Sequence, residues 1–281
     1  MRTLPCRRAL LALAGCFAWT AGCSGPSSVQ MAEAAYQSGE YDSAIAWSTK
    51  AIDKDSGAAD AYLIRGKCYE KKGEPMRAAA DFEVARVEMP DRGEPAFRQA
   101  KCYLAAGRSV DAETTINRAL KERYKGYSLR DQMLAHAVHG EVQMAVGDYP
   151  RASDSFGTAL NVARTSRPLE AEGATGVLHY NLSRAQFEQG SYRKSRESFQ
   201  SYLQAQKRTG ERPREQDLYT LTVLHFLCED IPASRNLAST LSPEYKARAE
   251  EILSGETFSV GALYDLKLKQ KQSESATDSN P

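Results

Sequence analysis

The sequence predicts an all-α protein in which antiparallel two-helix units stack into a superhelix, an α-solenoid. Three observations predict this class. Glycines recur about 34 residues apart, small residues hold fixed positions around each glycine, and a large residue follows at a fixed distance in most units. Glycine ends a helix in the left-handed conformation, and small residues let two helices approach closely. A period of this length is typical of a helical repeat array.

The composition agrees with a folded repeat protein. The chain has 281 residues, of which 42% are apolar and 26% charged, values typical of a well-folded soluble protein. Its formal net charge is +1. Recognition of nucleic acid needs a basic face, so we expect no nucleic-acid partner.

The segment 1–22 has the pattern of an export signal. Arg2, Arg7 and Arg8 form a positive start, and an apolar run over 9–21 follows them. That run is too short for a typical transmembrane helix. We therefore expect residues 1–22 to be removed and not to belong to the fold.

A small-residue motif, TAGC, ends at Cys23 and resembles the bacterial lipobox. The resemblance implies that Cys23 carries the lipid (palmitate) and that residues 23–28 form the anchor and tether. Ser24 resembles the residue found in lipoproteins of the outer membrane, so we expect a periplasm-facing protein anchored there. A second motif, LAGC at Cys16, leaves a cramped apolar segment. Thr20 departs from the usual Leu, and the alternative is cleavage near Ala21 that releases a soluble protein.

Four small positions recur at offsets 0, 7, 12 and 19 over residues 29–255, which we expect to be the repeat array. The sets are Ala32, Gly39, Ala44, Ala51; Gly66, Gly73, Ala78, Ala85; Ala100, Gly107, Ala112, Ala119; Gly140, Gly147, Ala152, Ala159; and Ser183, Gly190, Ser195 with Tyr202. One unit cannot bury its apolar stripe alone, so neighbouring units must stack.

The second set extends to eight positions that resemble the tetratricopeptide repeat consensus. They are Tyr62, Gly66, Tyr69, Gly73, Ala78, Phe82, Ala85 and Pro90, with Tyr62 where Trp is usual. The resemblance covers residues 25 to about 209. It implies an array that binds a protein or peptide segment in a concave groove lined by first helices.

The remaining elements are less regular. A sixth, degenerate unit is assigned to Leu221, Cys228, Ala233 and Thr240, without the glycine. Extra residues near 127–132 and 168–175 predict longer helices or loops. Ser242 and Pro243 predict the start of a capping helix over 243–253. Residues 256–281 form a C-terminal segment, which we expect to be a disordered tail from about residue 267.

In the family that the chain resembles, the second, fifth, sixth, ninth and twelfth residues of each repeat face the groove, with the first small position as residue eight. This positional rule places several side chains there. The partner-binding residues that it selects are Lys67, Phe97, Arg98, Lys101, Tyr180, Asn181 and Arg184. This set predicts a moderately basic groove with aromatic groups, suited to an extended segment with acidic side chains. The lysine and asparagine positions of the chaperone-type carboxylate clamp are not matched. The alternative for the cations is a solvated helix face with ion pairs within one helix, and helix packing is the alternative for Phe97 and Tyr180.

No catalytic signature is found, and we expect neither a metal nor another cofactor. His136 and His139 are three residues apart, but no third ligand is in register. Cys68 and Cys102 occupy equivalent positions too far apart for a disulfide, so both are expected to be buried thiols. Phosphate loops, serine elbows and cysteine nucleophile motifs are not recognisable in the chain.

The sequence therefore favours a non-enzymatic scaffold that is exported, lipid-anchored and bound to a protein of the cell envelope. It resembles bacterial tetratricopeptide lipoproteins that organise membrane or cell-wall complexes. A second hypothesis is an array that binds a glycan or small ligand and regulates a cell-wall enzyme, with Tyr180, Phe187 and Glu188 as its candidate cluster. Self-association through the repeat faces is a third.

Overall fold

The computed structural model describes residues 26–122, 126–165 and 168–254. Within these residues the chain forms helices and no strands. The helices are α1 (Ser28–Gln37), α2 (Tyr41–Lys54), α3 (Ala59–Lys71), α4 (Pro75–Glu88), α5 (Glu94–Ala105), α6 (Ser109–Glu122), α7 (Leu129–Ala145), α8 (Tyr149–Thr165), α9 (Pro168–Glu188), α10 (Tyr192–Arg208), α11 (Glu215–Leu227), α12 (Ile231–Ser239) and α13 (Pro243–Ser254).

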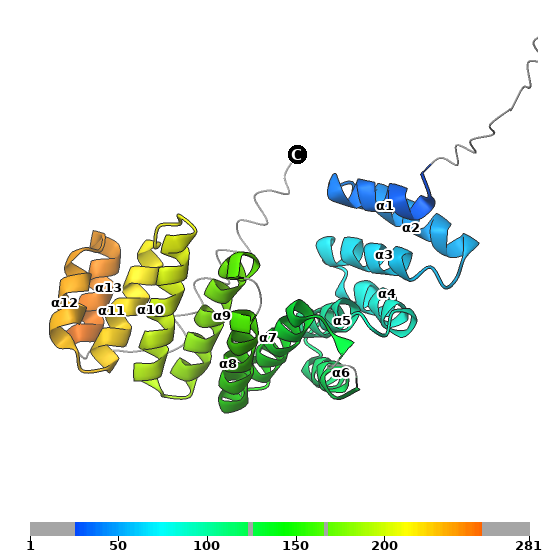
Figure 1. The fold of residues 1–281 in the computed structure, drawn as a ribbon. Helices are drawn as coiled ribbons and strands as arrows, with labels where there is room; N and C mark the ends of the chain where they lie inside the picture. The colour runs from blue at the N-terminus through cyan, green and yellow to red at the C-terminus, as the bar shows by residue number, and fades with distance from the viewer. Residues whose placement is uncertain (1–25, 123–125, 166–167, 255–281) are drawn as a thin grey trace, which may run out of the picture.

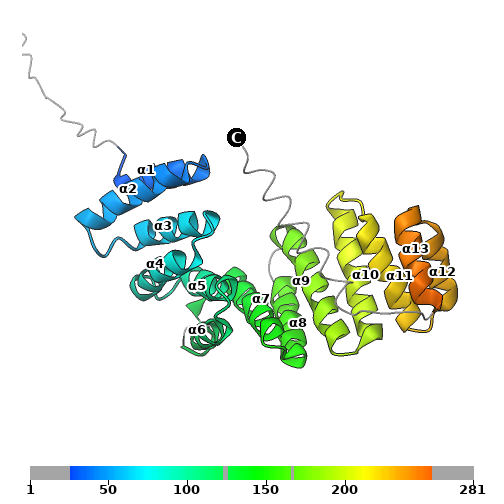
Figure 2. The same cartoon turned by 180° about the vertical axis from the view of Figure 1, so that it is seen from behind.

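Over the described ranges the helices pack as six consecutive antiparallel pairs, followed by α13. Each helix contacts the next along the chain, and first helices such as α5 and α7 also contact one another. Figures 1 and 2 show the resulting curved stack, with α1 at one end and α12 and α13 at the other. The all-α superhelix expected from the repeat is therefore confirmed.

The tight turns between paired helices depend on a left-handed residue. Gly39, Gly73, Gly107, Gly147 and Gly190 all have φ between +72° and +80°. At Gly73 the glycine N–H donates to the carbonyl of Glu70, and the next N–H donates to the carbonyl of Tyr69. This is the Schellman arrangement that closes a helix end. The five glycines thus have the role predicted for them.

Small residues in the first position of the repeat make room for a large side chain on the second helix of the same pair. A Cβ placed on Gly66 would lie 2.7 Å from the ring of Phe82, and one on Gly140 would lie 2.6 Å from the ring of Phe156. Both rings are fully buried. The absence of a Cβ is therefore what allows each phenylalanine to reach across the helix pair.

In each helix pair, a larger residue at this position of the first helix generally goes with a smaller residue on the second helix, and we call the two residues an inverse-size pair. Where the first residue is larger than glycine, the second is generally smaller than phenylalanine: Ala32 with Ser48, Ala100 with Ile116, and Thr222 with Ala238. Ser183 with Phe199 is the exception. There the hydroxyl groups of Ser183 and Ser195 form hydrogen bonds between α9 and α10. Ser183 Oγ donates to the carbonyl of Ser195 over 2.8 Å.

The sixth pair is better formed than the sequence indicated, and its expected register is wrong by one residue. Glu229, not Cys228, occupies the left-handed turn position, with φ +62°. The matching small positions are Thr222 and Ser234, which are both buried. Ser234 Oγ donates a 2.9 Å hydrogen bond to the backbone carbonyl of Thr222. The assignment through Leu221, Cys228, Ala233 and Thr240 failed because no glycine marks the turn.

The extra residues after the third pair lengthen the helices. Helices α7, α8 and α10 have 17 residues and α9 has 21, whereas the helices of the second and third pairs have 12 to 14. Helix α13 lies at the end of the stack, where expected. It is not wholly polar, because Ala249 and Ile252 are buried against the last core cluster.

Several expectations lie outside the described residues. These are the export signal over 1–22, the lipid site at Cys23 and the tail from about 267. Among the helices that the structure does describe, none is both long enough and apolar enough to cross a membrane.

Candidate partner-binding groove

A cavity of about 500 Å3 opens between first helices α3, α5 and α7. Its apolar floor comes from Phe97 on α5 and from Leu134 and Val138 on α7. Charged side chains surround this floor, and they are Glu70, Arg92, Glu94, Arg98, Lys101, Arg130, Asp131 and Glu141. The volume is in the range of sites that hold a ligand or a side-chain anchor of a partner.

Phe97 belongs to the floor and is not an exposed contact. Its side chain is only 3% exposed. The ring packs edge-on against Tyr127, with centroids 5.6 Å apart, and covers Gly93, where a Cβ would lie 2.3 Å from it. Phe97 therefore lines the cavity but offers a partner little surface, because helix packing has already buried most of the ring.

Carboxylates hold three of the four cations predicted for the groove, and they lie on the same helix or on a neighbouring one. Arg98 contacts Glu70 at 2.6 Å and Glu94 at 2.9 Å, and Lys67 contacts the same Glu94 at 2.9 Å. Burial alone would raise the pKa of Glu94, but the hydrogen bonds and charges of Lys67 and Arg98 outweigh it and lower that pKa. Glu70, Arg98, Glu94 and Lys67 thus form one continuous chain of ion pairs between α3 and α5.

Lys101 completes the set on the other side. It contacts Glu141 of α7 at 3.3 Å and remains about half exposed. Cations and carboxylates are therefore interleaved in this part of the groove, and the moderately basic character expected from the sequence is wrong here. The alternative of ion pairs within one helix holds only for Arg98 with Glu94, because the other pairs join different helices.

The three predicted residues on α9 do not line this cavity. The Tyr180 ring packs against Tyr202 and Phe199, with centroids 5.3 and 6.3 Å apart. Asn181 and Arg184 are half-buried on the same helix, and Arg184 Nε is buried without a hydrogen-bond partner. The structure therefore divides the predicted site into a cavity at α3–α7 and a separate set on α9.

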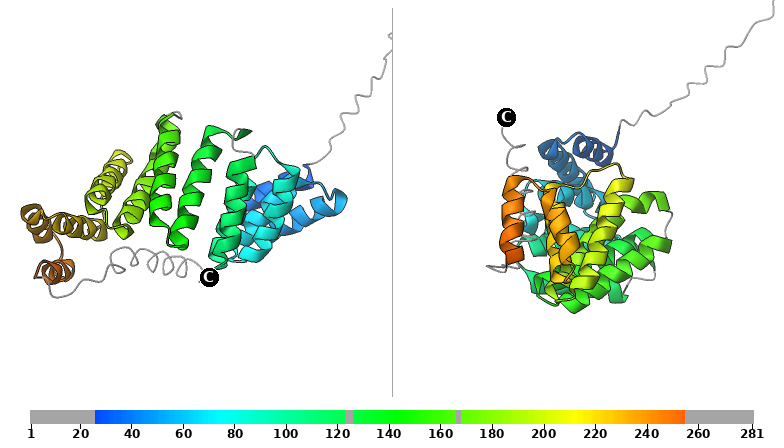
Figure 3. Two further views of the ribbon diagram at one scale, coloured as in Figure 1. Left: turned by 90° about the horizontal axis from the view of Figure 1, so that it is seen from below. Right: turned by 90° about the vertical axis from the view of Figure 1, so that its left-hand side faces the viewer.

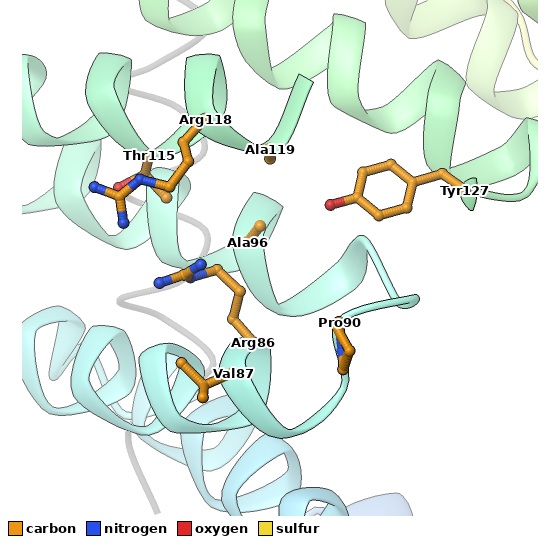
Figure 4. Close-up of a pocket in the computed structure, with 8 residues that line it drawn as sticks. All are labelled: Arg86, Val87, Pro90, Ala96, Thr115, Arg118, Ala119 and Tyr127. Carbon is orange, nitrogen blue, oxygen red and sulfur yellow. The ribbon is translucent and has the colours of Figure 1, made fainter. Parts of the chain in front are cut away.

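A smaller cavity of about 180 Å3 lies among α4, α5 and α6 (Figure 4). Arg86 and Arg118 project toward it from two second helices, and the Tyr127 hydroxyl points to it from the segment before α7. Arg86 is already paired with Glu83 at 2.6 Å. The volume is below that of typical ligand sites, so the α3–α7 cavity is the better candidate.

The histidines and cysteines of the described helices have structural surroundings. His139 Nδ1 lies 2.9 Å from Ser155 Oγ, and its Nε2 lies 3.1 Å from the amide of Gln143. Cys68 and Cys102 are free and buried, as predicted, and burial raises their thiol pKa values to about 11 and about 12. In the described part of the chain, no three His, Cys, Asp or Glu side chains gather as a metal site would require.

Comparison with known proteins agrees with this geometry. Residues 29–93, which span α1 to α4, match the sequence family described as tetratricopeptide repeat. These residues form the first two helix pairs of the array, and the later pairs of the described residues continue the same superhelical fold. Among curated protein sequences, no match to the chain is found.

Solved structures with this fold superpose over most of the array. The structure of pilF from Pseudomonas aeruginosa covers 80% of this chain and 96% of its own, at 16% identity and a TM-score of 0.60. PilW, described as a widely conserved type IV pilus biogenesis factor, covers 78% and 96%, at 16% identity and 0.61. MamA covers 65% and 92%, at 15% and 0.52. At these identities the likeness establishes the fold of the tetratricopeptide array alone.

Two carboxylates of the ion-pair chain were missed at the sequence level. Glu94 is the second residue of its repeat and Glu70 the twelfth, and both positions belong to the face that the family resemblance assigns to the groove. Applying that positional rule to acidic as well as basic side chains would have found them. It would also have predicted a groove of balanced charge.

Proposed function

We propose that the protein is a non-enzymatic scaffold that holds a partner protein in its concave groove. The observation that carries the proposal is the cavity between α3, α5 and α7, with an apolar floor inside a ring of alternating charges. Repeat arrays of this kind use extended concave surfaces for binding. Apolar anchors supply most of the binding free energy at such surfaces, and charged groups select the partner and fix its register.

Export and lipid anchoring complete the proposal. The support is the basic and apolar segment over 1–22 and the TAGC motif at Cys23. The partner would then be a protein of the bacterial cell envelope, and the scaffold would serve the assembly or organisation of a membrane or cell-wall complex. Fractionation of cells that make the full chain or Cys23→Ala tests this part. Recovery of both in the cytoplasm would contradict it.

The groove is tested by reversing one of its ion pairs. Lys101→Glu places two carboxylates together with Glu141, and adding Glu141→Lys restores an attractive pair with exchanged positions. If the cavity recognises the partner, affinity capture from detergent-solubilised membranes loses the partner with the double variant, whose melting temperature stays near that of the parent chain. Arg184→Glu, on α9 outside the cavity, is the matched control and should retain the partner. Equal capture by all variants would contradict the assignment.

The alternative of a glycan-binding array loses one of the two aromatic rings in its candidate cluster. Phe187 is only 1% exposed, and its ring packs edge-on against Tyr192. A sugar ring stacks on an exposed aromatic face, so Phe187 cannot provide one. No other observation in the described residues favours this function over the protein scaffold.

A further inference from the structure

Positive charge is concentrated in one repeat of this nearly neutral protein. Residues 192–214, which form α10 and the connection to α11, contain seven Lys and Arg against two Glu. The equivalent segment 75–93, with α4, contains three against four, and segment 41–58, with α2, contains two against three. The full chain has a formal net charge of +1, so α10 and its connection account for more than the whole excess.

Four of these cations gather where α10 ends. Lys207, Arg208, Arg212 and Arg214 are all exposed, and we call them the basic edge. Lys207, Arg208 and Arg212 have no ion-pair partner among the described residues. Arg214 reaches the buried Asp217 only at 3.6 Å and stays 54% exposed. By contrast, Lys67, Arg98 and Lys101 of the α3–α7 groove each contact a carboxylate at 3.3 Å or less.

The basic edge has the features of a surface for a diffuse anionic partner. Residues 207–214 contain no aromatic or large aliphatic side chain. Protein interfaces depend on such anchors, and single-stranded nucleic acids stack on aromatic rings. A bilayer that contains acidic lipids needs only positive charge, because its negative surface potential attracts each basic residue near it.

The position of the basic edge also suits a membrane. Figures 1 and 2 draw the α10–α11 connection on the same upper side of the curved stack as the start of α1, and the right-hand view in Figure 3 agrees. Cys23 lies five residues before Ser28, the first residue of α1. A bilayer that holds Cys23 therefore faces the side of the molecule that carries the basic edge.

We propose that Lys207, Arg208, Arg212 and Arg214 form a second, electrostatic membrane contact that binds acidic phospholipid headgroups. The inference deepens the proposed lipid anchoring and rests on it for the position of the bilayer. One anchor at the end of a long array leaves the array free to pivot. Contact at the fifth repeat would lay it along the surface and fix the direction in which the concave groove opens.

The test measures binding to vesicles with the chain of residues 24–281, which retains every residue of the hydrophobic clusters but lacks Cys23. Vesicles of phosphatidylcholine with an equal part of phosphatidylglycerol are compared with phosphatidylcholine alone. The edge variant is Lys207→Gln, Arg208→Gln and Arg212→Gln. The control variant, Arg193→Gln, Lys194→Gln and Arg235→Gln, removes the same charge from exposed cations outside the basic edge.

We expect the parent chain to sediment with the acidic vesicles at ~0.05 M salt and to be released at ~0.5 M, since salt screens surface charges. The edge variant should bind at least about tenfold more weakly than the parent, and the control variant should bind within about twofold of the parent. Failure of the parent chain to bind, or an equal loss in both variants, would overturn the proposal. So would tighter binding to a single-stranded oligonucleotide than to vesicles, lost in the edge variant.

Failure of this proposal and failure of the anchor give different results. The vesicle assay contains no Cys23, so its outcome does not depend on lipidation. Fractionation of the full chain with Cys23→Ala reports on the anchor alone. If the full chain is membrane-anchored through Cys23 but the chain of residues 24–281 does not bind vesicles, the proposed membrane contact of the basic edge is wrong and the proposed scaffold function stands.

Discussion

The two halves of the array join their helices with different chemistry. In the second repeat, Arg65 holds Asp81 of its own helix pair through two 2.8 Å contacts and reaches Thr49 of the preceding pair at 3.2 Å. In the third, Gln99 bonds back to Glu83. The same position holds Leu182 and Leu221 in the fifth and sixth repeats, where serine hydroxyls and aromatic rings make the contacts.

This difference explains why the cavity lies between α3, α5 and α7 and not at α9. Charged pairs between α3, α5 and α7 leave polar groups and a cavity between these first helices. In the second half the Tyr180 ring lies against Phe199 and Tyr202 and is used in packing. One backbone repeat can therefore leave a cavity between its helices at one place and extend the core at another.

The largest expected effect comes from breaking the charged contact of the second repeat. Asp81→Ala leaves the half-buried guanidinium of Arg65 without its main partner and should cost about 3 kcal/mol in the free energy of unfolding. The double variant Arg65→Leu, Asp81→Leu imitates the apolar chemistry around Leu182 and should stay within about 1 kcal/mol of the parent. Urea denaturation measures both. A double variant as unstable as Asp81→Ala would show that apolar side chains cannot replace the charged pair in the second repeat.

The next effect concerns the inverse-size pairs. Gly66→Ala places a Cβ against the Phe82 ring, and overpacking of this kind costs about 1–3 kcal/mol. Adding Phe82→Ile recreates the pair formed by Ala100 and Ile116 and should recover at least half of that loss. Thermal melting followed by circular dichroism gives the comparison. No recovery would mean that the third repeat accommodates Ala100 for another reason.

A smaller, stabilising effect is expected at the turn of the sixth repeat. Glu229 has φ +62°, a conformation that costs a non-glycine residue about 1–2 kcal/mol. Glu229→Gly makes this turn equivalent to that at Gly190 and should raise stability by about 1 kcal/mol. Glu229→Ala, which keeps the Cβ, is the control and should change little. Denaturant melts of the three proteins decide this.

The smallest expected effect is a pH dependence of the free energy of unfolding, caused by histidines in the middle of the array. Burial lowers the pKa values of His136, His139 and His179, which lie on α7 and α9. The folded state therefore favours neutral imidazole, and stability falls as pH drops below about 6.5, where the unfolded chain gains protons. Replacing His179 by Leu should flatten the fall in melting temperature between neutral and mildly acidic pH. An unchanged slope would assign the dependence to other groups.

The sequence predicted the helix pairs well because the packing of each pair depends on residues in its own repeat. Gly73 and Ala78 meet requirements that are local in the chain, so their spacing is sufficient evidence. The sixth turn was missed because Glu229 takes a left-handed conformation that a glutamate rarely adopts. The five glycine turns could be predicted, whereas the register of the last pair could not.

The candidate site was predictable only in part. The positional rule found Lys101 and Arg98, but their charge is balanced by partners on neighbouring first helices, such as Glu70 and Glu141. Phe97 was assigned to the surface, but Gly93 and Tyr127 bury it. A helical face is visible in a sequence, while the depth of a side chain depends on the helix that lies beside it.

The inverse-size pairs also restrict how the sequence of this protein can change with time. A larger residue at Gly140 collides with Phe156, and a smaller residue at Phe156 leaves a void behind Gly140, so either change alone is penalised. Acceptable changes must come as two substitutions, one on each helix of the pair, in the order that passes through the less unstable intermediate. A repeat copied as a unit carries both members with it. Duplication of whole repeats is therefore an easier route to a longer array than the gradual conversion of one repeat into another.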